Sequence, residues 1–199
     1  TAALFITGNT PGNAKSTADL PAKEVPAPET KALESLRKTG AMVLPVAQGS
    51  HYLSVSFITL DSSLETALSL LAPLRQQIAW LNLGNTALSD KHLSALSGLT
   101  NITRLYLHNT KITDGGLPLL KPLSALRYIN LTGNGITARG LQSLSALKYL
   151  KSIYLNQTSV SGADFAGLQK AFPNAVIDTG GYRVPTLAMD TTEVVEVKK

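Results

Sequence analysis

Hydrophobic positions recur along the centre of the chain with a period of 24 residues. Four segments align without a gap, and they begin at Ile78, Ile102, Leu126 and Leu150. In each of them the first, fourth and sixth residues are apolar, which indicates a β-strand with one buried side. Two further apolar residues at i, i+3 spacing then predict a short returning helix. Successive copies therefore predict stacked strand–helix units whose strands form a parallel sheet.

Polar residues mark the ends of these units. A hydroxyl side chain suited to a helix N-cap precedes each returning segment, at Ser89, Thr113, Thr137 and Ser161. Pro118 lies inside the second returning segment and predicts a broken or 3₁₀ turn there. The turn after the strand carries an Asn in one copy and a Thr in the others, at Asn134 and at Thr86, Thr110 and Thr158. A Thr hydroxyl at this position can hold a neighbouring backbone group.

The flanking sequence predicts caps for the two ends of the stack. Residues 31–38 suit a short helix ended by Gly40, and residues 42–46 and 52–57 suit two strands joined by a turn. Pro45 cannot donate to a sheet ladder, so the first strand should lie at the edge. We divide the chain into a flexible Pro/Ala-rich linker over residues 1–28, a repeat domain over 29–182 and a C-terminal tail over 183–199. Within the repeat domain the cap covers 29–57, the 24-residue repeats about 78–171 and a half-repeat 172–182.

The spacing LxxLxLxx(N/T)x(L/I) over roughly residues 50–180 resembles the leucine-rich repeat superfamily. That resemblance implies an α/β solenoid with a parallel sheet on the concave face and short helices or 3₁₀ turns on the convex face. A helix and a hairpin would cap its N-terminal end. Solenoids of this kind commonly use the concave face for recognition.

A narrower resemblance extends from the helix at Lys31, through LPVAQGSHYLSVSF, to FPNAVIDTGGYRVPTLAMDTTEV. These stretches are similar to the C-terminal leucine-rich-repeat segment of bacterial envelope proteins that also carry a c-type cytochrome domain. The resemblance implies a periplasmic or cell-surface location within a larger membrane-anchored protein. The chain has no Cys and so no CxxCH haem motif of its own.

Composition and charge narrow the class of partner. The net charge is +5, and residues 75–170 hold ten basic residues against three Asp. Such a surface attracts acidic partners, but the charges are too dispersed to indicate nucleic acid. No run approaches the roughly 18 apolar residues of a membrane span, so membrane contact is expected only through segments outside this chain. We expect a monomer.

The sequence offers no constellation for catalysis, a cofactor or a metal. The segment ALFITGNTPGNAKST approaches a P-loop, but Ala14 precedes Lys15 and the glycine spacing is one residue too long. His51, His92 and His108 have no metal-ligand spacing, and we expect His51 and His92 to be solvated. We therefore expect a non-catalytic chain without cofactors.

Strand alternation predicts a face rich in aromatic and basic side chains. Its candidate partner-binding residues are Trp80, Asn82, Arg104, Tyr106, His108, Arg127, Tyr128, Asn130, Lys151, Tyr154 and Asn156. Tyr, Trp and Arg are the types enriched at binding hot spots. The favoured hypothesis is a protein partner, an acidic one by charge. The alternatives are a glycan stacked on the same rings, a structural spacer beside a cytochrome domain, and rings that serve only as cross-strand pairs.

Overall fold

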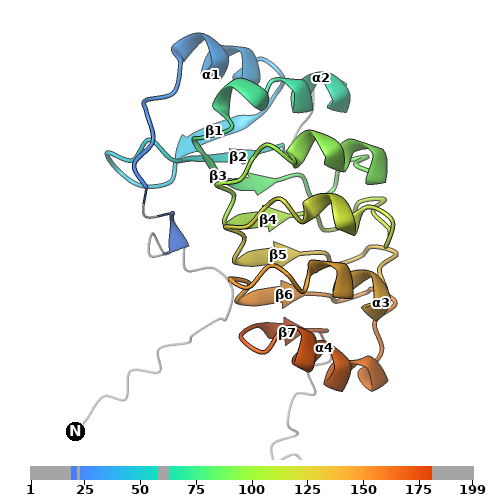
Figure 1. Ribbon diagram of the computed structural model, residues 1–199. Coiled ribbons are helices and arrows are strands. Elements are labelled where there is room, and N and C mark those ends of the chain that lie inside the picture. The colour runs from blue at the N-terminus through green and yellow to red at the C-terminus, as the bar shows by residue number, and fades with distance from the viewer. Residues whose placement is uncertain (1–18, 22, 58–62, 181–199) are drawn as a thin grey trace, which may run out of the picture.

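The structure, a computed structural model, describes residues 19–21, 23–57 and 63–180. Within these ranges seven strands form one sheet whose order follows the chain from β1 to β7 (Figure 1). The strands are β1 Met42–Pro45, β2 Leu53–Ser56, β3 Ile78–Asn82, β4 Arg104–Tyr106, β5 Tyr128–Asn130, β6 Ser152–Tyr154 and β7 Val176–Asp178. β1 pairs antiparallel with β2 as an edge hairpin, and every later pairing is parallel.

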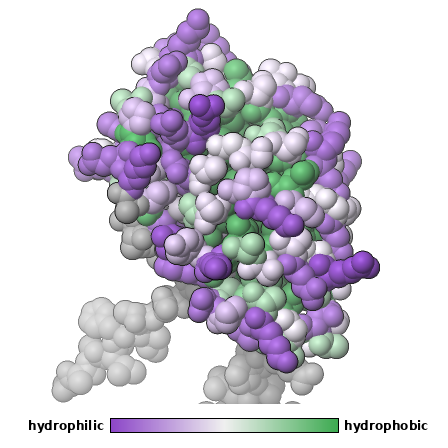
Figure 2. All heavy atoms as spheres, in the orientation of Figure 1, coloured by the Kyte–Doolittle hydropathy of each residue, from purple (hydrophilic) through white to green (hydrophobic). Residues whose placement is uncertain are grey.

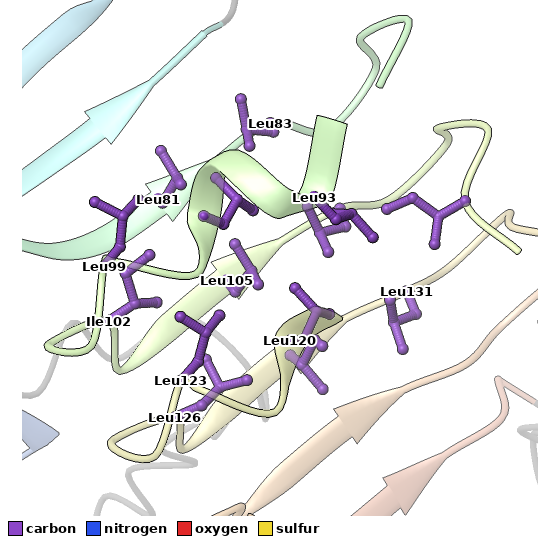
Figure 3. Packing of buried hydrophobic residues seen from close by; sticks show 14 of the residues in the cluster. Leu81, Leu83, Leu93, Leu99, Ile102, Leu105, Leu120, Leu123, Leu126 and Leu131 are labelled. Carbon is purple, nitrogen blue, oxygen red and sulfur yellow. The ribbon is translucent and has the colours of Figure 1, made fainter. Parts of the chain in front are cut away.

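The register of the parallel strands follows the repeat. Leu81 pairs with Leu105, Leu105 with Ile129, and Ile129 with Ile153, so each strand is shifted by one full repeat from its neighbour. The side chains of the repeated apolar positions are almost completely buried between the sheet and the returning segments (Figure 3). The fold is a leucine-rich-repeat α/β solenoid, as the 24-residue period predicts.

The returning segments are mostly 3₁₀ helices. In the four aligned repeats they comprise Asp90–Leu96, Leu117–Leu120, Gln142–Leu144 and Gly162–Asp164, with α-helical turns at α3 Ala138–Leu141 and α4 Phe165–Ala171. The 3₁₀ turn at Pro118 was predicted, but the first return is 3₁₀ without any proline. Leu93 and Leu96 are both buried, and their spacing of three residues is compatible with a 3₁₀ helix as well as with an α-helix.

The N-terminal cap has the predicted parts. α1 Thr30–Arg37 is followed by Gly40 at φ 85°, and Pro45 lies in the edge strand β1. α2 Leu64–Ser69 and a 3₁₀ helix over Ala72–Leu74 lie between β2 and β3, before the first of the four aligned repeats. Figure 1 shows α1 and α2 closing the end of the stack.

The threonines that replace Asn134 perform its backbone role. The hydroxyls of Thr86, Thr110 and Thr158 donate to the carbonyls of Leu83, Leu107 and Leu155 at 2.7–2.9 Å, and Asn134 Nδ2 donates to Leu131 O at 2.9 Å.

His92 differs from its expected solvated state. It is 9% exposed, its Nδ1 accepts from the Ser89 N–H, and its Nε2 lies 3.1 Å from Glu65 Oε1. Capping of the first return therefore buries the imidazole.

The linker expected over residues 1–28 also differs in part. Its described residues, 19–21 and 23–28, contact the solenoid, and Val25 is only 8% exposed. Figure 1 shows this segment running from α1 past the hairpin toward β4. Residues 1–18 of the expected linker, residues 181–182 of the half-repeat and the expected tail lie outside the described residues.

Candidate binding face

The sheet side opposite the returning segments, which we call the concave face, carries two rows of side chains across the strands. The first row, the tryptophan row, consists of Leu44, Ser54, Trp80, Arg104, Tyr128, Ser152 and Val176. The second row, the tyrosine row, consists of Met42, Ser56, Asn82, Tyr106, Asn130, Tyr154 and Asp178. Because parallel strands lie about 4.8 Å apart, side chains of neighbouring repeats touch along both rows.

Three tyrosine rings form a continuous ladder over β4, β5 and β6. The ring centroids of Tyr106 and Tyr128 are 5.0 Å apart, and those of Tyr128 and Tyr154 are 4.9 Å apart. Burial, with the neighbouring rings, raises the pKa of the Tyr128 hydroxyl far above its ordinary value, and burial also raises the pKa of Tyr154. All three side chains remain partly accessible. The ladder is therefore an accessible aromatic surface in which the hydroxyls of Tyr128 and Tyr154 are neutral at physiological pH.

Arg104 joins the tyrosine ladder to Trp80. Its guanidinium carbon lies 5.2 Å from the Trp80 ring centroid and 5.7 Å from that of Tyr128, within the range of a cation–π contact. The guanidinium is oriented between the two rings, and Arg104 is 7% exposed. A planar, permanently charged donor held in this way is preorganised to bind an anionic group.

Trp80 and Arg104 differ from their expected place on a solvated face. Trp80 is 5% exposed and packs with Val25, Tyr52 and Leu20. Arg104 Nη2 donates to Asp19 Oδ2 at 3.0 Å, and Lys151 Nζ donates to Asp19 Oδ1 at 3.0 Å. Alternation within a strand predicts which face a side chain takes, but it carries no information on a distant segment that covers that face.

Two of the predicted asparagines hold turns. Asn82 Oδ1 accepts from the Gly84 N–H and Asn130 Oδ1 from the Thr132 N–H, each at 3.0 Å. Asp178 does the same for Gly180 at 2.8 Å. These side chains end their strands, and the bonds restrain them for any contact with a partner.

His108 and Asn156 contact glycines in the adjacent repeat. A Cβ on Gly84 would lie 2.1 Å from the His108 ring, and one on Gly180 would lie 2.4 Å from Asn156 Cγ. His108 Nε2 is 3.2 Å from Asn85 Nδ2, and burial lowers the pKa of the imidazole. Both residues thus contribute to packing between repeats.

Arg127 lies beside the rows, immediately before β5. Its guanidinium carbon is 5.8 Å from the ring centroid of Tyr149, which is 63% exposed. Of the eleven predicted residues, six are linked by ring, cation–π or ion-pair contacts: Trp80, Arg104, Tyr106, Tyr128, Lys151 and Tyr154. Asn82 and Asn130 lie on the same face, in the tyrosine row.

Sequence reasoning missed Asp19 and the residues around it. Asp19 is the one acidic residue among residues 1–23, and Leu20 and Val25 follow it within a Pro-containing stretch. A charged residue beside two apolar ones was the available signal for a docked segment.

Other kinds of site are absent from the described parts of the chain. Residues 19–21, 23–57 and 63–180 contain no group of three or more His, Cys, Asp or Glu arranged to hold a metal ion. In the same ranges no helix combines the length and the hydropathy needed to cross a bilayer.

The chain was compared with known protein families, curated proteins and solved structures, and only solved structures match it. No protein-family model and no curated protein matches the sequence. Solved structures that match include a leucine-rich-repeat protein of Leptospira interrogans, with 19% identity, a TM-score of 0.45 and coverage of 59% of this chain. An internalin of Listeria monocytogenes matches with 19% identity, a TM-score of 0.41 and coverage of 77%. The matched regions span 28% and 58% of those two proteins.

Proposed function

We propose that the chain is a non-catalytic protein-interaction module that binds an acidic segment of a partner on the concave face. The observation that carries this proposal is the arrangement of Arg104 and Lys151 beside the tyrosine ladder. Both cations already hold one carboxylate, and the ladder offers aromatic area next to them. Rigid aromatic rings next to positioned donors are typical of energetically dominant interface residues.

Geometry favours a protein over a glycan. A sugar-binding face would use Trp80 as a stacking platform and the Asn side chains as donors to hydroxyls. Asn82 and Asn130 accept backbone N–H bonds that orient them toward their own turns, so these side chains are already engaged. Rows that cross several strands suit an extended peptide or a flat protein surface.

The setting of the module is part of the same proposal. We place it in the periplasm or at the cell surface, as one part of a larger membrane-anchored envelope protein that carries a c-type cytochrome domain. The support is the similarity of residues 31–57 and 172–194 to segments of such proteins. Any haem chemistry would belong to that other domain.

A double substitution on the ladder tests the proposal. Tyr106→Ala with Tyr128→Ala removes the accessible rings, and we expect it to abolish partner capture from a cell-envelope extract. The expected loss of stability is about 1–2 kcal/mol, the value of the lost cross-strand pairs. Tyr149→Ala is the matched control, because it removes an exposed ring outside the two rows and should leave capture unchanged.

Thermal melts of all three proteins show whether each variant is folded. Capture of every wild-type partner by the folded double variant would contradict binding on the concave face. Binding to an acidic partner should also weaken as salt increases, whereas binding to a neutral glycan should not.

A further inference from the structure

Both carboxylate oxygens of Asp19 are bound on the concave face. One accepts from Arg104 and the other from Lys151, residues that lie 85 and 132 positions away in the sequence. The side chains of Asp19 and Arg104 are 19% and 9% exposed, whereas that of Lys151 is 58% exposed. Burial alone would raise the pKa of Asp19, but the hydrogen bonds and charges of Lys151 and Arg104 outweigh it and lower that pKa.

The residues after Asp19 are held through their backbone carbonyls. Tyr52 Oη donates to Lys23 O at 2.5 Å, and Gln77 Nε2 donates to Pro26 O at 3.1 Å. His51 Nδ1 lies 2.9 Å from Val25 O. Proteins that bind an extended peptide commonly do so through hydrogen bonds to its main chain, and here side chains of the solenoid donate to the carbonyls of the segment.

Packing against the sheet is apolar but incomplete. Leu20 and Val25 pack with Trp80 and Tyr52, and the guanidinium carbon of Arg104 lies 5.2 Å from the Trp80 ring centroid. A hollow of about 350 Å³ remains between this segment and the turn of the hairpin. The segment therefore has the features of a bound peptide: a carboxylate held by two cations, two apolar side chains packed against the solenoid, and three backbone carbonyls that accept hydrogen bonds. The hollow shows that its packing against the hairpin is incomplete.

We propose that Arg104 and Lys151 form a carboxylate-binding subsite whose internal ligand is Asp19. Residues 19–21 and 23–26 then occupy the surface that an acidic peptide of the partner would take, and partner binding requires the release of this segment. The proposal rests on the proposed function, because it assigns the chemistry of the partner's anchoring group and adds an intramolecular competitor. Because this competitor belongs to the same chain, its effective concentration at the subsite is high. Even weak contacts then suffice for it to compete with the partner's acidic peptide.

The single Trp of the chain reports directly on release. Trp80 lies under the segment, so its fluorescence should be weakly quenched by acrylamide in the wild type. Asp19→Asn removes the charge that Arg104 and Lys151 bind, and we expect at least a twofold rise in the quenching constant. Glu24→Gln is the matched control, because it removes the same charge from an exposed position of the same segment.

A peptide added in trans tests the subsite itself. The probe is a fluorescein-labelled synthetic peptide with the sequence of residues 17–28, measured by anisotropy on the full chain. We expect it to bind the Asp19→Asn protein at least tenfold more tightly than the wild type or Glu24→Gln. A peptide with Asn at position 19 should lose this binding, as should the Asp19→Asn, Arg104→Gln double variant.

Three results would overturn the proposal. They are equal affinity of the peptide for the wild type and Asp19→Asn, equal binding of the Asp and Asn peptides, and no binding to the Asp19→Asn protein at about 1 mM peptide. Circular dichroism confirms that each variant is folded. These outcomes do not involve the Tyr106 and Tyr128 rings, so failure here leaves the test of the proposed function intact. Failure of partner capture, in turn, leaves the peptide result standing.

Discussion

At the scale of single residues, two aspartates connect neighbouring repeats. Asp90 accepts from the N–H and the hydroxyl of Thr113 at 2.8 and 2.5 Å. Asp114 accepts from the corresponding groups of Thr137 at the same distances. A glycine three residues after each Thr leaves room for the carboxylate, since a Cβ on Gly140 would lie 2.0 Å from Asp114 Oδ1. Each carboxylate thus satisfies a backbone donor at the start of the next return.

We expect Asp114→Ala to lower the free energy of unfolding by about 1–2 kcal/mol, because the half-buried Thr137 N–H loses its acceptor. Urea denaturation measures the change. Asp164→Ala is the comparison. Asp164 bonds to Ser161 within its own turn, at the exposed surface of the last return, and its hydrogen bonds make no link to a neighbouring repeat, so its loss should be smaller. Equal losses of unfolding free energy in the two variants would show that a contact between repeats stabilises the protein no more than a bond within one turn.

At the scale of elements, the turn after each repeat strand uses a left-handed residue. Asn85, Asn109, Gly133 and Gln157 occupy the same repeat position and have φ of 58°, 52°, 70° and 54°. Asn tolerates this region better than most residues, and Gly adopts it without steric cost. Asn109 Nδ2 also donates to Asn85 Oδ1 at 3.0 Å, which links the turns side by side.

We expect Gly133→Ala to destabilise the protein by about 1–2 kcal/mol, because Ala at positive φ is strained and its Cβ would lie 2.1 Å from Asn109 Oδ1. Gly167→Ala is the control of opposite sign. Gly167 lies within α4 and a Cβ there meets nothing within 4 Å, so helix propensity should give a gain of up to about 1 kcal/mol. A gain in thermal stability for both variants would contradict the strained turn.

The elements themselves were largely predictable from the sequence. The 24-residue period defined the strands and their register, and the hydroxyls of Thr137 and Ser161 marked true N-caps. The choice between α and 3₁₀ helix was not predictable, because a four-residue return satisfies i, i+3 spacing in either form. The burial of His92 was missed for a similar reason, since its partner Glu65 belongs to the preceding repeat.

At the scale of the whole molecule, the candidate site could be predicted only in part. The tyrosine ladder follows from alternation and stacking, both of which are visible in a single sequence. Leu20 and Val25, which cover Trp80, lie 60 and 55 positions from it in the sequence, and Asp19 lies 132 positions from Lys151. No local pattern encodes contacts over such separations. Figure 2 shows one side of the molecule, on which polar residues cover much of the surface and apolar ones occupy smaller areas.

Acid should release the segment that carries Asp19, Leu20 and Val25 from the concave face while the solenoid remains folded. The pKa of Asp19 in the docked state lies below its ordinary value of 3.8. At pH values above 3.8 the Asp19 carboxylate is therefore charged and contributes fully to docking. This contribution is lost as the pH falls through the lowered pKa. We therefore expect acrylamide quenching of Trp80 to stay low between pH 7 and about pH 4.5 and to rise below about pH 3.5.

The Asp19→Asn protein provides the decisive comparison for this acid response. Without a titrating group at position 19, its quenching should be high at pH 7 and change little as the pH falls. Glu65 has a pKa of about 2, lowered by a backbone hydrogen bond and by His92 and Lys91. Measurements that stop above about pH 2.5 keep this link between α2 and the next return largely charged, and circular dichroism checks that the solenoid is still folded. An identical rise in quenching for the wild type and Asp19→Asn would mean that other carboxylates control release, and Asp19 would then be only a surface contact.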